Sequence, residues 1–62
     1  MSFDFDSLYQ TYVNQVKDSG FEPTVQDFLD ESSAMIDSRL QDGEDPRPQD
    51  LFVIEYALAN KL

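Results

Sequence analysis

Carboxylates are the most abundant reactive groups in this chain of 62 residues, which contains nine Asp and four Glu. Two neighbouring carboxylates can work as general acid and general base, and Asp4 with Asp6 or Asp30 with Glu31 are candidate pairs. Such a pair needs a pocket around it, which helical chains of this size rarely contain. The sequence has no Cys and no His, so its serines have only carboxylates as bases. We therefore predict that the protein is not an enzyme.

Metal and cofactor sites have equally little support. Without Cys or His the chain lacks the usual ligands of zinc and haem. The segment that ends in Asp42-Gly43 resembles part of a calcium loop, but alignment on Gly43 places Leu40 where an oxygen ligand is required. The two glycines stand alone, so no phosphate-binding loop is present in the sequence. We predict no cofactor and no metal.

The net charge of -9 restricts the class of partner. Direct nucleic-acid binding requires clustered Lys and Arg, and the chain has four basic residues in total. An anionic membrane surface would repel the chain, and no stretch approaches the roughly 20 apolar residues of a membrane span. The first residues do not resemble a signal peptide. We expect a cytoplasmic protein that binds neither nucleic acid nor membrane.

The elements that must position these groups are three helices, the first predicted over residues 5–19. Its apolar residues fall on one stripe at helical spacing: Phe5, Leu8, Tyr9, Tyr12, Val13 and Val16. Asp4 or Asp6 is suited to cap the start. Gly20 is suited to end the helix in a left-handed turn, in which Phe21 would contact Val16.

The second helix is predicted over residues 24–41. Thr24 is a good N-cap, and Asp27 three residues later completes an acidic variant of the capping box. Apolar residues again follow the helical period, at Val25, Phe28, Leu29, Met35, Ile36 and Leu40. Gly43 ends this helix.

The third helix is predicted over residues 48–61, after an extended linker at 44–48 whose last residue also begins the helix. Pro48 suits its first position, and Asp50 lies in its first turn. From Leu51 onward the helix is apolar nearly all round, which indicates burial on more than one side. Either all of it packs inside, or one side meets a second chain through Phe52, Val53 and Tyr56.

Residues 1–62 are therefore predicted to form a single all-α domain, either a small three-helix bundle or a helical hairpin with a C-terminal helix. A chain of this length buries only about 60% of its unfolded surface, so its stability is marginal. Disulfides and structural metals are not available to it. The additional stability must come from close packing or from completion of the bundle by homodimerisation.

The acidic residues are concentrated along the second helix and the linker. We predict that they form a face that binds a protein with a basic surface, such as a nucleic-acid-binding protein. Its members are Asp27, Asp30, Glu31, Asp37, Asp42, Glu44, Asp45 and Asp50. The protein would then be a regulator, an inhibitor or an assembly factor. Two alternatives are a nucleic-acid mimic of viral or plasmid type and a structural subunit of an oligomer without a regulatory role.

Overall fold

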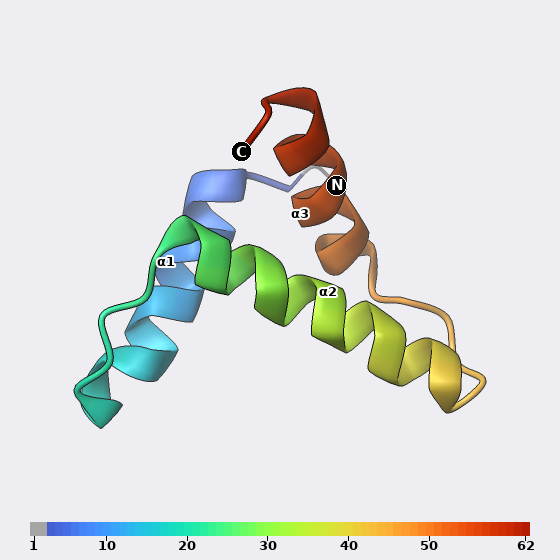
Figure 1. Ribbon diagram of the computed structural model, residues 1–62, viewed down its shortest axis with the longest axis horizontal. Coiled ribbons are helices and arrows are strands. Elements are labelled where there is room, and N and C mark those ends of the chain that lie inside the picture. The colour runs from blue at the N-terminus through green and yellow to red at the C-terminus, as the bar shows by residue number, and fades with distance from the viewer. Residues whose placement is uncertain (1–2) are drawn as a thin grey trace.

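The computed structural model describes residues 3–62 and shows a chain folded into helices (Figure 1). α1 spans Phe5–Val16, and a short 3-10 turn, η1, follows at Lys17–Ser19. α2 spans Val25–Gln41 and α3 spans Pro48–Ala59. No strand occurs among the described residues, and the predicted all-α fold with three helices is confirmed.

α1 begins as predicted but ends differently. The carboxylate of Asp4 accepts hydrogen bonds from the backbone N–H of Ser7 at 3.3 Å and from its hydroxyl at 2.8 Å, which makes Asp4 the cap. After Val16 the chain tightens into η1. In this 3-10 turn each backbone N–H bonds to the carbonyl three residues earlier, and not four residues earlier as in an α-helix. Gly20 is left-handed as expected, with φ of 79°. The predicted Schellman turn forms only in part: the N–H of Gly20 bonds to the carbonyl of Lys17 as this turn requires, but its second bond, from the N–H of Phe21 to the carbonyl of Val16, is absent.

α2 has the predicted capping box at its start. The Thr24 hydroxyl accepts from the N–H of Asp27 at 3.2 Å, and the Asp27 carboxylate accepts from the N–H of Thr24 at 2.9 Å. A Schellman turn closes the other end, where the N–H of Glu44 bonds to the carbonyl of Arg39 at 2.8 Å. Gly43 supplies the left-handed residue of this turn, with φ of 75°.

α3 starts at Pro48 as predicted, with Arg47 extended before it. It ends two residues earlier than predicted, because a second Schellman turn joins the N–H of Leu62 to the carbonyl of Ala57 at 2.9 Å. The left-handed position of this turn is occupied by Lys61, with φ of 55°.

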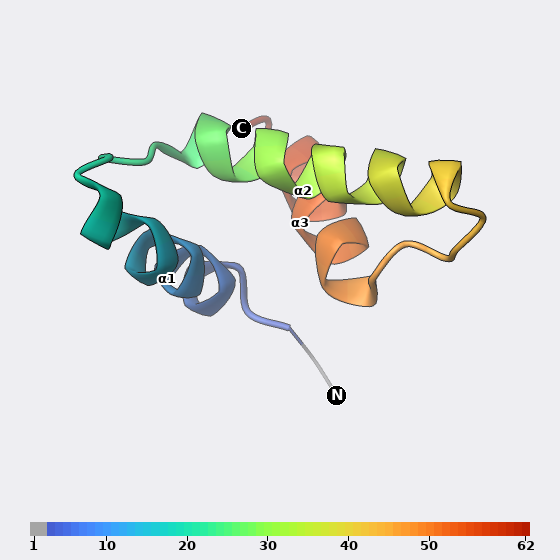
Figure 2. The same ribbon diagram turned by 90° about the horizontal axis from the view of Figure 1, so that it is seen from below.

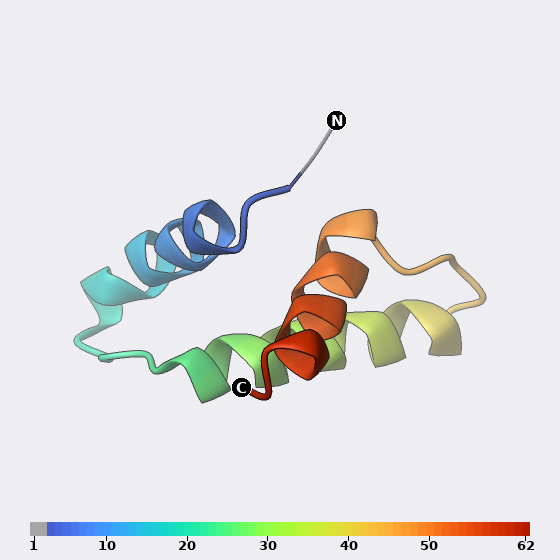
Figure 3. The ribbon, with the colours of Figure 1, turned by 90° about the horizontal axis from the view of Figure 1, so that it is seen from above.

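The buried core draws on all three helices: Phe5 from α1, Phe28 and Leu29 from α2, and Val53 and Ala57 from α3. α2 and α3 share the largest interface, and α1 packs against both less extensively. Figure 2 and Figure 3 show that α1 and α3 lie on the same side of α2.

Aromatic side chains attach α1 to the other two helices. The ring of Phe28 lies 5.4 to 5.6 Å from three rings of α1, those of Phe5, Tyr9 and Tyr12. Phe5 also stacks on Tyr56 of α3, with ring centroids 4.4 Å apart. The Tyr9 hydroxyl donates to the carbonyl of Pro23 at 3.3 Å.

Within residues 3–62, no helix is both long and apolar enough to cross a membrane.

Candidate functional site

Most of the predicted acidic face is exposed. Six of its eight members lie at the surface of α2, of the turn that ends it and of the linker, and we call these residues the acidic band: Asp30, Glu31, Asp37, Asp42, Glu44 and Asp45. Asp30 and Asp37 are seven residues apart, so they share the side of α2 that faces away from the buried Ser32. Asp27 is half-buried and is held by the capping box.

Two members of the acidic band already have partners within the chain. The Gln26 amide donates to the carboxylate of Asp30 at 3.0 Å, and the Arg39 guanidinium donates to Glu44 at 3.2 Å. Both contacts are exposed to solvent, where such pairs contribute only about 0 to 1 kcal/mol. A basic partner could therefore replace either contact at little cost.

Asp50 does not belong to this surface, and its predicted place on the acidic face is wrong. The residue is 4% exposed, and the Arg47 guanidinium donates to both of its carboxylate oxygens, at 2.7 and 3.0 Å. Pro48 starts the helix between them, which places Arg47 at the cap and Asp50 three residues on, within reach of a bidentate pair. Hydrogen bonding to Asp50 raises the pKa of Arg47, although burial opposes this effect.

The three apolar residues of α3 that were predicted to meet a partner differ in their exposure. Val53 is 2% exposed, so the prediction that it contacts a partner is wrong. Phe52 is half-buried, and Tyr56 is 39% exposed with one ring face covered by Phe5. A helix that is apolar all round does not reveal from its sequence which side turns inward.

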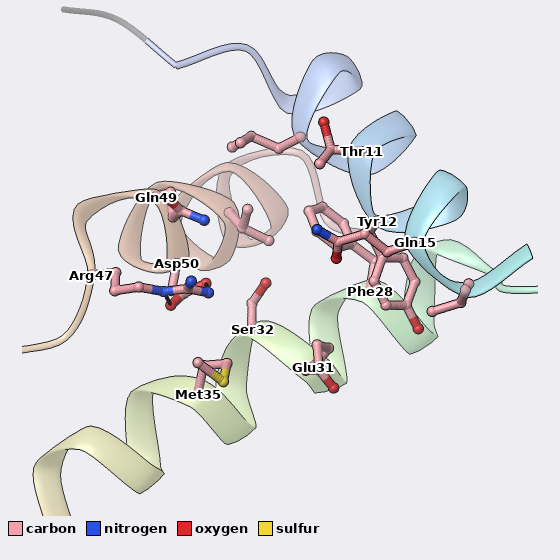
Figure 4. A pocket seen from close by; sticks show the side chains of 13 residues that line it. Thr11, Tyr12, Gln15, Phe28, Glu31, Ser32, Met35, Arg47, Gln49 and Asp50 are labelled. Carbon is pink, nitrogen blue, oxygen red and sulfur yellow. Dashed lines mark hydrogen bonds and ion pairs between the residues drawn. The ribbon is translucent and has the colours of Figure 1, made fainter.

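The three helices enclose an open cleft of about 360 Å³, which the sequence analysis did not anticipate (Figure 4). Its apolar lining consists of Leu8, Tyr12 and Val16 from α1, Phe28 and Met35 from α2, and Val53 from α3. The volume lies within the range of small-molecule and anchor-residue sites, which commonly occur between the helices of bundles. The cleft depends on how α1 sits against α2, so no local sequence signal could have indicated it.

The hydroxyl groups of Ser32 and Tyr12 lie at the cleft. Ser32 projects from α2 into the space beside the pair of Arg47 and Asp50 (Figure 4). The pKa of the Tyr12 phenol is raised, first by burial and then by carboxylates including those of Asp27 and Glu31. The electrostatic potential near this hydroxyl is therefore negative.

Glu31 both lines the cleft and belongs to the acidic band. Asp30, its neighbour in sequence, is turned to the outer side of α2, where it bonds Gln26. The two carboxylates considered as an acid–base pair thus face different directions. In the part of the chain that the structure describes, no three acidic side chains are grouped to hold a metal ion.

The net charge is unevenly divided along the chain. Residues 1–46 hold eleven acidic and two basic residues, which accounts for the whole net charge of -9. Residues 47–62 hold two of each sign, namely Arg47, Lys61, Asp50 and Glu55. The segment 47–62, which consists of α3 and its flanking residues, is therefore electrically neutral, whereas the acidic excess lies in residues 1–46 and is densest along α2 and the linker.

Comparison with models of protein families, with curated protein sequences and with solved structures gives no match.

Proposed function

We propose that the protein is a non-catalytic binding module that acts as a regulator, an inhibitor or an assembly factor. Its partner would be a protein that presents a basic segment to the acidic band and inserts one side chain into the cleft. The observation that supports this proposal is the position of Glu31, which joins the charged surface to the apolar cleft.

The two surfaces have complementary roles in such an interaction. Protein interfaces are typically anchored by a few side chains in desolvated pockets and surrounded by a polar rim. The apolar lining of the cleft suits an aliphatic or aromatic anchor, and the Tyr12 end suits a positively charged head group. The acidic band would accelerate and orient the encounter with a basic partner.

Affinity capture from the native host, followed by mass spectrometry, tests the proposal with matched variants. Glu31→Gln with Asp37→Asn removes two charges of the acidic band, whereas Asp18→Asn with Glu22→Gln removes two exposed charges outside it. A partner captured by the wild type should be lost by the first variant and kept by the second. Its capture should also weaken as salt screens the charges, since the Debye length is about 10 Å at 0.1 M.

The folded state of each variant is checked by circular dichroism, because all four carboxylates are exposed and their loss should leave the helices intact. A partner that binds both variants equally, or that binds equally well in high salt, would contradict the acidic band as the binding surface.

A further inference from the structure

The outer side of α3 carries an uncovered apolar stripe. Leu51 is 43% exposed and Leu58 is 76% exposed, with the half-buried Ile54 between them. These residues are three and four positions apart, so they share one side of the helix. Leu62, 55% exposed, follows at the end of α3. We call these four residues the α3 stripe.

The α3 stripe is directed away from the rest of the molecule. The opposite side of the same helix carries Val53 and Ala57, which are buried against α1 and α2. The cleft also lies on that inner side, because Asp50 and Val53 line it. An interaction at the α3 stripe would therefore leave the cleft open.

The charge of residues 47–62 indicates which kind of molecule fits the α3 stripe. A nucleic acid or an anionic membrane would be repelled by the net charge of -9, and a basic partner would find no excess of carboxylates here. A second copy of the chain meets neither difficulty, because residues 47–62 are neutral. Two copies in contact along α3 keep their acidic segments on the outside of the pair.

One charge in α3 and one just after it favour one orientation of two copies. Glu55 and Lys61 lie three residues before and three residues after Leu58. In an antiparallel pair with a two-fold axis near Leu58, each Leu58 meets its equivalent, and each Glu55 lies toward Lys61 of the second copy. A parallel pair would instead place like charges at the same height.

We propose that the protein forms a homodimer through the α3 stripe, as an antiparallel pair about a two-fold axis near Leu58, in which Ile54 of each copy faces Leu62 of the other and Leu51 lies at the edge of the interface. This interface uses the side of α3 opposite to Val53. The dimer would display two clefts and two acidic bands.

Sedimentation equilibrium over a range of protein concentrations tests this proposal. The wild-type mass should approach twice 7.1 kDa as the concentration rises. Leu58→Ser should raise the dissociation constant by at least about tenfold, because each dimer loses two of its most exposed apolar side chains. Leu40→Ser makes the same change at a 58% exposed position on α2 and should leave the mass unchanged.

A charge exchange tests the orientation. Lys61→Glu should weaken the dimer by placing two acidic groups together, and the double variant Glu55→Lys with Lys61→Glu should restore it. Failure of this restoration would overturn the antiparallel arrangement. A wild-type mass of 7.1 kDa at every concentration, or equal effects of the two leucine variants, would overturn the α3 stripe as a self-association surface.

Discussion

Replacing Asp50 with asparagine tests whether the buried ion pair stabilises the start of α3. Asparagine has nearly the same shape, so the change removes the charge and leaves the packing almost unaltered. The side chain of Asp50 is 5% exposed, whereas that of Arg47 is 35% exposed. The substitution therefore leaves a guanidinium that has lost its counter-charge but retains partial access to water.

The expected loss follows from these exposures. Breaking a fully buried pair costs about 3 to 5 kcal/mol, and partial hydration of Arg47 reduces this to about 2 kcal/mol. Chains of this length have a free energy of unfolding of about 3 to 9 kcal/mol. The variant should consequently lose a large share of its stability, with a decrease in Tm of about 10 °C.

Urea denaturation followed by the helical circular dichroism signal measures this loss, and the chain contains a matched control. Glu44→Gln removes the exposed pair with Arg39, whose side chains are 59% and 36% exposed, and it should change the free energy of unfolding by less than about 0.5 kcal/mol. Equal effects of the two substitutions would refute the argument that burial makes the Asp50 pair important.

Three smaller predictions concern helix ends and titration. Thr24→Ala should lower the free energy of unfolding by about 1 kcal/mol in urea, because the α2 cap is lost. Lys61→Gly should raise it by about 0.5 to 1 kcal/mol by relieving a left-handed residue, whereas Asn60→Gly, where φ is -104°, should lower it. Burial and nearby carboxylates raise the pKa of Tyr12, so the folded chain keeps this proton longer than the unfolded chain. Stability should therefore fall as the pH rises beyond about 10, and Tyr12→Phe should reduce that fall in urea titrations.

Helix starts were the most predictable part of the fold. Thr24 with Asp27, and Pro48 at the first position of α3, act within one turn, so their sequence spacing alone specifies the structure. Gly20 was expected to be left-handed and is so, and Gly43, which was expected to end the second helix, has the same conformation. Gly20 nevertheless follows a 3-10 turn, whereas Gly43 belongs to a complete Schellman turn, and the spacing of the glycines in the sequence does not distinguish the two endings.

Features that depend on tertiary packing were not predictable in the same way. Asp50 resembled the other exposed carboxylates in the sequence, but its pairing with Arg47 buried it. The apolar residues of α3 surround the helix, so periodicity could not show that Val53 faces inward while Leu58 faces solvent. The cleft could not be predicted because it depends on how α1 packs against α2.

α1 forms one wall of the cleft and is also less extensively packed than α2 and α3 are with each other. Proteins open transiently in cooperative units, and weakly packed units open at the lowest free energy. Detachment of α1 as one unit would dismantle the cleft while the hairpin of α2 and α3 persists. A partner seated in the cleft binds only the closed form and so raises the free energy of this opening. Amide hydrogen exchange in α1 should therefore slow more than exchange in α3 when the cleft is occupied, which makes the first helix an internal reporter of binding.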